Sequence, residues 1–258
     1  MRKLRYCVPY TLTRRYVIGV NLNIQEFKQF IKEHIHALEP SGKENPLKVQ
    51  KRFQLTPREY LSFAENELNN SSDVSRINCV SHLKRALDCQ LDTYFHTFNL
   101  YELFNKRAIK VKTKLEFIGA LGFLNSRSLV RLNNIRNGME HDYVVPDIAD
   151  IEVYFDLITA LVQLLEHGAF EAAGCDFGIY SDTSCSDFNE LIIKYDQHNT
   201  SIHVQIKAGE EENNITFTTS AETNIEDFAY MFKVLRMLNL LWDCQWGHEF
   251  VLRELEIT

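Results

Sequence analysis

A change in hydrophobic period near Gly174 is the feature that most constrains the fold of this 258-residue chain. From Thr56 to about Phe170, apolar residues recur every three or four positions, as they do on one face of an α-helix. Beyond Gly174 they alternate with polar residues, as in strands that are covered on one face. The sequence therefore predicts an α+β protein, with a central up-and-down helical bundle and a smaller module built on an antiparallel sheet.

The helical region contains recognisable start signals. Thr56 and Pro57 supply an N-cap and a proline at the first helical position. Ser72 or Asp73 caps a longer helix, whose predicted core stripe comprises Ile77, Val80, Leu83, Leu87, Leu91 and Tyr94. Three further helices are predicted, in "KLEFIGALGFLN", in "SRSLVRLNNIRNGMEHDY" and in "DIADIEVYFDLITALVQLLEHGAF".

Four strands are predicted after Gly174, in "FGIYSD", "NELIIKYDQ", "TSIHVQIKA" and "NNITFTTS". An amphipathic helix, "IEDFAYMFKVLRMLNLLWD", follows them, and "HEFVLRELEI" is predicted as a last strand or helix. At the other end of the chain, "RRYVIGVNLN" indicates one or two strands before a helix from Ile24 to Leu38. The predicted domains are residues 1–55, with strands, a helix and a linker, residues 56–172, the bundle, and residues 173–258, an α+β accessory module.

Composition excludes several classes of protein. The net charge of −7 argues against a protein that coats nucleic acid indiscriminately. The six cysteines form no C-x-x-C pair and the nine histidines no H-E-x-x-H pattern, so we expect neither a metal site nor a cofactor. The chain shows neither a signal peptide nor an apolar run long enough to span a membrane, and we expect a cytoplasmic protein.

The stretch "IRNGMEHDY" places an arginine, Arg136, five residues before a histidine, His141. An α-helix turns about 100° per residue, so five residues correspond to about 140°. In projection His141 faces away from the core, whereas Arg136 lies at the edge of the core face and Tyr143 lies on that face. Arginine binds phosphate oxygens and histidine transfers protons near neutral pH, which is chemistry suited to a phosphodiester.

A solvated helix face is the alternative interpretation of this stretch. Arg136 and Glu140 are four residues apart, the spacing of an ordinary surface ion pair on a helix. Tyr143 likewise has two interpretations, as an aromatic side chain packed beside Pro146 or as a residue that is modified. Spacing alone favours the solvated surface, because such pairs often arise by chance.

The local sequence resembles the R-x4-6-H signature of the HEPN superfamily, which includes many ribonucleases of toxin and phage-defence systems. Asn137 matches the polar residue that commonly follows the arginine, and Tyr143 completes an R-x4-H-x-Y pattern. This variant is similar to that of HEPN toxins whose tyrosine is adenylylated by minimal nucleotidyltransferase antitoxins. The resemblance covers about residues 56–170. It implies that Arg136 and His141 are catalytic, that Asn137 supports them, and that two protomers assemble the site.

The resemblance implies a metal-independent endoribonuclease, in which the ribose 2′-hydroxyl is the internal nucleophile and the protein acts in a toxin–antitoxin or anti-phage system. Its expected partners are RNA, a second copy of the chain and an antitoxin or other defence protein. Basic residues before and within the motif helix are the candidate RNA-binding residues: Lys106, Arg107, Lys110, Lys112, Lys114, Arg127 and Arg131. The alternative is a non-catalytic HEPN-fold subunit that binds a protein or a nucleotide.

Overall fold

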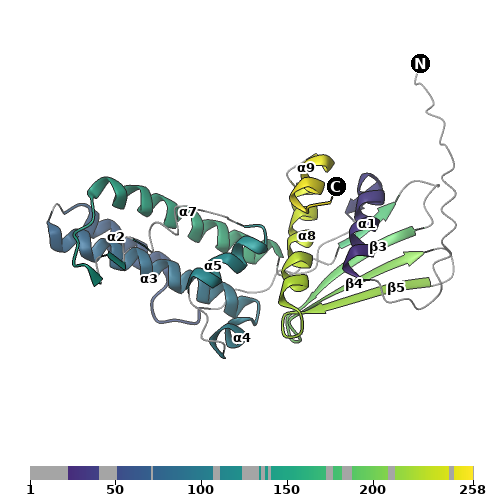
Figure 1. The fold of residues 1–258 in the computed structure, drawn as a ribbon, viewed down its shortest axis with the longest axis horizontal. Coiled ribbons are helices and arrows are strands. Elements are labelled where there is room, and N and C mark those ends of the chain that lie inside the picture. Colours follow the sequence, from purple (N-terminus) through teal and green to yellow (C-terminus); the bar gives the residue numbers. More distant parts are fainter. Residues whose placement is uncertain are drawn as a thin grey trace, which may run out of the picture.

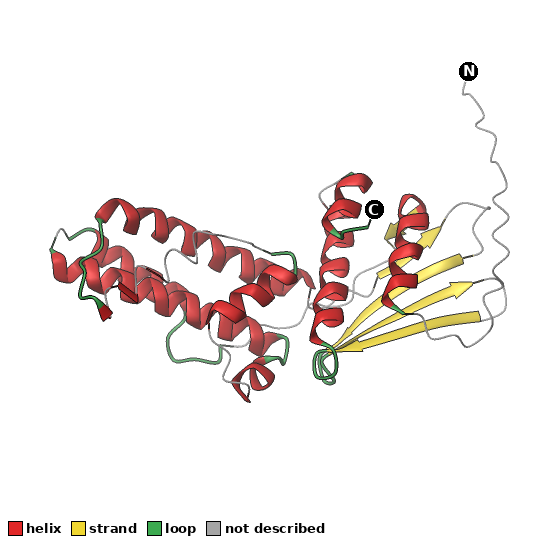
Figure 2. Cartoon of the chain, in the orientation of Figure 1, coloured by secondary structure: helices red, strands yellow, loops and turns green. Residues whose placement is uncertain are grey.

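The computed structural model describes residues 23–40, 51–70, 72–106, 111–123, 134, 137–138, 141–172, 177–181, 188–208, 213–243 and 247–257. Helices occupy one half of the elongated molecule, and a sheet with its covering helices occupies the other half (Figure 1, Figure 2). The predicted α+β class is confirmed.

The helical half contains α2 (Pro57–Leu68), α3 (Asp73–Thr97), α4 (Tyr101–Lys106), α5 (Val111–Ala120) and α7 (Ile148–Ala172). Helix α2 begins as predicted, because the Thr56 side chain accepts from the backbone N–H of Glu59 and the Glu59 carboxylate accepts from that of Thr56. Helix α5, which was predicted in "KLEFIGALGFLN", begins earlier than expected, at Val111, and ends at Ala120. Gly122 follows with φ +81°, a conformation that terminates helices and favours glycine.

The core of the bundle forms where α2, α3 and α7 pack together. The predicted stripe of α3 is buried from Val80 through Tyr94, whereas Ile77 is 39% exposed and does not belong to this core. From α7, the residues Ile151, Tyr154, Ile158, Leu161 and Leu165 are buried. The ion pair between Arg58 of α2 and Glu166 of α7, with Nε to Oε1 at 3.0 Å, joins the start of α2 to the end of α7.

The other half is built on a sheet in the order β1-β2-β3-β4-β5, with each pair of neighbours antiparallel. Its strands are β1 (Leu38–Pro40), β2 (Phe177–Ser181), β3 (Phe188–Asp196), β4 (Ser201–Ala208) and β5 (Asn213–Ser220). The four strands predicted after Gly174 are therefore confirmed. Alternation buries Leu191, Ile193, Ile202, Val204 and Ile206, and helix α8 (Ile225–Asp243) packs on β4 and β5. The last predicted element is a helix, α9 (His248–Glu254).

The N-terminal segment joins this sheet, a question that the sequence leaves open. Helix α1 (Ile24–His34) and the short helix η1 (Ile35–Ala37) lead into β1, which pairs with β2 at Leu38 and Ser181. The Lys28 ammonium of α1 lies 4.3 Å from the ring centre of Tyr230 on α8. The strands predicted before Asn23 lie outside the described residues.

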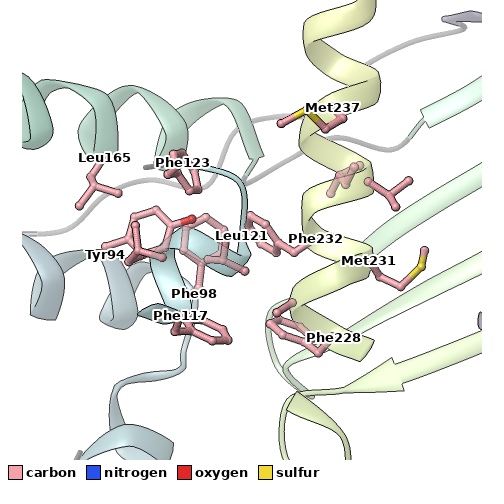
Figure 3. Close-up of a cluster of buried hydrophobic side chains, with 14 of the residues drawn as sticks. Tyr94, Phe98, Phe117, Leu121, Phe123, Leu165, Phe228, Met231, Phe232 and Met237 are labelled. Carbon is pink, nitrogen blue, oxygen red and sulfur yellow. The ribbon is translucent and has the colours of Figure 1, made fainter. Parts of the chain in front are cut away.

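An aromatic cluster joins the two halves (Figure 3). The ring of Phe98, just after α3, lies 5.1 Å from that of Phe232 on α8 and 5.6 Å from that of Tyr195 on β3. The Tyr195 hydroxyl donates to the Phe98 carbonyl, and the Gln197 amide donates to the Thr97 carbonyl at 2.8 Å. Because the contact combines buried aromatic area with hydrogen bonds to the end of α3, it fixes α3 against the sheet.

Two glycines give opposite expectations for the same substitution. A Cβ on Gly168 of α7 would lie 2.0 Å from the Phe123 ring, whereas a Cβ on Gly138 would meet nothing within 4 Å. Gly168→Ala is therefore expected to lower the free energy of unfolding by about 1–3 kcal/mol through overpacking. Gly138→Ala should leave it unchanged or raise it by up to about 1 kcal/mol through helix propensity. Urea denaturation of both variants tests this, and equal effects would contradict the packing of Phe123 on α7.

Candidate active site

The described residues of the motif lie at the end of a helix. Asn134, Asn137, Gly138 and His141 are helical, and the helix ends at His141. The Asp142 N–H donates to the Gly138 carbonyl at 2.9 Å, the last turn of this helix. Arg136 lies outside the described residues.

The histidine of the motif is open to solvent. His141 is exposed, as the helical projection predicts for a side chain that faces away from the core. Asn137, one turn earlier, is half-buried. An exposed imidazole followed immediately by the end of its helix can be reached by a large substrate such as RNA, or by a second protein chain.

Tyr143 does not lie on the core face, so the prediction from the helical projection is wrong. Its side chain is 87% exposed and its φ is +58°. The projection assumes a helix through residue 143, whereas the helix ends two residues earlier. Packing beside Pro146 is therefore not its role, and its hydroxyl is accessible to another molecule.

The candidate RNA-binding lysines and arginines are only partly described. Lys106 ends α4 and Lys112 lies in the first turn of α5, whereas Arg107, Lys110, Arg127 and Arg131 lie outside the described residues. Lys114 is engaged within the protein. Its ammonium lies 2.6 Å from the Asp92 carboxylate on α3, and its side chain is only 17% exposed. Lys114 therefore holds α5 against α3, and this ion pair leaves it unsuited to bind RNA.

Exposed apolar side chains lie on the elements that meet at the end of the bundle where the motif ends. We call this set the end patch; it comprises Val74, Ile77, Tyr143, Val144, Val145 and Val153. Val74 and Ile77 lie in the first turns of α3, and Val153 lies near the start of α7. Both helices begin at the end of the bundle that is far from the sheet, where residues 142–147 form the loop into α7 (Figure 2). The Pro146 carbonyl accepts from Arg76 of α3 at 3.4 Å, which holds that loop against α3.

The end patch is not predicted by the sequence analysis, although part of its signal is present there. Ile77 follows the helical spacing of the α3 core but is 39% exposed. The run Tyr143-Val144-Val145 is apolar but follows the end of the motif helix, where helical periodicity no longer applies. Six exposed large apolar residues at one end of a bundle are typical of a surface that another chain covers.

Comparison with protein-family models, with curated proteins and with solved structures finds no match to this chain. Among the described residues, no three histidine, cysteine, aspartate or glutamate side chains are grouped so that they could hold a metal ion. Within the same residues, no helix has the length and apolar character required to cross a bilayer. The HEPN resemblance thus depends on the motif and on the order of the helices around it in the chain.

Proposed function

We propose that this chain is a metal-independent endoribonuclease of the HEPN type, with an active site that forms between two copies of the chain. One observation carries the proposal. His141 is exposed at the end of its helix, and the exposed apolar run from Tyr143 to Val145, part of the end patch that another chain could cover, follows it directly in the chain. A histidine directed into solvent supplies one proton-transfer group, and a second protomer would supply another.

The proposed reaction needs two proton transfers. A neutral imidazole takes the proton of the ribose 2′-hydroxyl, the 2′-oxygen bonds to phosphorus, and the bond from phosphorus to the 5′-oxygen breaks. A protonated imidazole gives its proton to the departing 5′-oxygen. The products are a 2′,3′-cyclic phosphate and a 5′-hydroxyl end. Arg136 would stabilise the charge on the phosphate oxygens, and Asn137 would help to hold the site.

The arrangement of the helices supports a HEPN-like bundle. Helix α2 packs on α3, and α7 packs on both. The motif helix ends directly before the loop into α7, so the motif lies between the long helix α3 and the apolar helix α7 in the chain, as the resemblance implies. The site would then be at the end of the bundle, with the sheet half at the opposite end (Figure 1).

The end patch supports a two-fold dimer rather than a monomer. An isologous interface uses the same surface on both subunits, so the apolar side chains of one copy would cover those of the other. Such a seam would bring both His141 side chains close together and would exclude water around them. The exposed Tyr143 would lie at its margin, where an antitoxin enzyme of a defence system could modify the hydroxyl.

Cleavage in excess chelator tests the proposed activity. The purified chain, incubated with total cellular RNA and excess EDTA, is expected to produce fragments that end in 2′,3′-cyclic phosphate. An Arg136→Ala variant should not produce them, because the phosphate charge would lack its partner. Abolition of cleavage by EDTA would contradict the mechanism, and cleavage that survives Arg136→Ala would contradict the assigned site.

A further inference from the structure

A pocket of about 390 Å³ opens in the side of the bundle, where residues 51–58 lie across α3. Its apolar walls come from Phe53, Leu55 and Pro57, and Glu166 of α7 lies on its border. A volume of this size accommodates a small organic molecule. No motif in the sequence indicates it, because it forms only when the segment before α2 folds back on α3.

The inner wall of the pocket is polar where the bundle should be apolar. Gln90 and Thr97 follow Leu83 at steps of seven residues, which places them on the buried stripe of α3. Both are buried, Gln90 to 2% exposure, and both line the pocket. The Tyr94 hydroxyl, which also lines the pocket, is buried and has no hydrogen-bond partner among the described residues. A buried polar group without a partner is unfavourable unless a ligand or water supplies one.

The mouth of the pocket is cationic. Lys51, Arg52 and Arg58 line it, against the single carboxylate of Glu166. Arg58 is paired with Glu166, whose hydrogen bond and charge raise the pKa of the Arg58 guanidinium. Lys51 is exposed and lies 3.8 Å from Glu59, and Arg52 is exposed beside it. With Glu59 and Glu166 both counted, one positive charge remains in excess at the mouth, and it favours an anion.

The pocket is separate from the motif. Arg76, which holds the loop after the motif, and Gln90 are 14 positions apart on α3, which corresponds to about 21 Å along the helix. The pocket instead lies near the junction with the sheet, since Thr97 lines it and its carbonyl accepts from Gln197. A molecule in the pocket would therefore contact neither His141 nor the end patch.

We propose that this pocket binds a small organic anion, which places an apolar ring between Phe53 and α3, a hydrogen-bonding group at Gln90, and its negative charge beside Lys51 and Arg52. The proposal does not depend on the ribonuclease activity, because none of these residues belongs to the proposed active site. It assigns to the bundle a ligand site at the end opposite the motif.

Fluorescence titration of the full-length protein tests the proposal with two probes. The first is 8-anilinonaphthalene-1-sulfonate, which combines an aromatic body with an anionic group, and the second is N-phenyl-1-naphthylamine, which lacks the sulfonate. We expect the sulfonate to bind with one site per chain. Thr93→Phe, which fills the pocket from α3, should weaken binding of both probes at least 10-fold. Lys51→Gln with Arg52→Gln should weaken only the sulfonate, by about 3- to 10-fold.

Arg253→Gln on α9 removes a positive charge far from the pocket and is the matched control, with unchanged binding expected. Each variant is accepted only if its thermal unfolding transition matches that of the wild type. If Thr93→Phe does not fold, the double charge variant alone decides. Unchanged sulfonate binding in Thr93→Phe or in the double variant would overturn the proposal, as would equal weakening by Arg253→Gln.

Discussion

A Val144→Asp variant is expected to be monomeric and to have lost RNA cleavage. Val144 is 57% exposed within the end patch, so the fold should tolerate the change and the free energy of unfolding should move by less than about 0.5 kcal/mol. In the proposed dimer, each copy would place an unpaired carboxylate in an apolar seam, at a cost of about 3–5 kcal/mol. This cost raises the dimer Kd by about 150- to 4,000-fold.

Sedimentation equilibrium and the cleavage assay, performed at one protein concentration, measure the two effects together. Thr223→Asp, in the exposed turn before α8, adds the same charge far from the end patch and should change neither property. A Val144→Asp protein that is still dimeric and fully active would show that the end patch is not the interface. A monomer with full activity would show that the site needs only one chain.

His141→Ala is expected to lower the rate constant of RNA cleavage by about 10²- to 10⁴-fold, the usual contribution of a general acid or base. His141 is exposed, so its removal should change neither the unfolding transition nor the dimer. Gly138→Ala is the matched control on the same helix, because a methyl group there meets nothing within 4 Å. A His141→Ala protein that cleaves RNA as fast as Gly138→Ala would remove histidine from the mechanism.

Local signals in the sequence predicted which helices and strands form more accurately than they predicted where these elements end. The four strands after Gly174 were predictable because alternation is a property of each strand by itself. The start of α2 was predictable because Thr56, Pro57 and Glu59 act within one turn. The end of the motif helix at His141 was not predictable from apolar spacing, since Val144 and Val145 continue an apolar run after the helix has stopped.

Features that depend on distant parts of the chain were beyond the sequence analysis. Lys114 and Asp92 are 22 positions apart, and only the packing of α5 on α3 shows that this lysine is engaged. The pocket forms only because residues 51–58 cover α3, and this packing was not predictable. One signal of it was present in the sequence, because the polar residue Gln90 occupies a core position of a helix. For the candidate site, the exposure of His141 agrees with the projection, and the assigned chemistry stays a prediction.

Mixing the wild type with His141→Ala tests most directly whether two copies share one active site. The two proteins are mixed at constant total concentration, allowed to exchange subunits, and assayed for RNA cleavage in excess EDTA. If each site needs a histidine from both protomers, activity follows the square of the wild-type fraction, and an equal mixture retains about one quarter of the activity. If each chain acts alone, the equal mixture retains about one half, and that result would contradict the shared site.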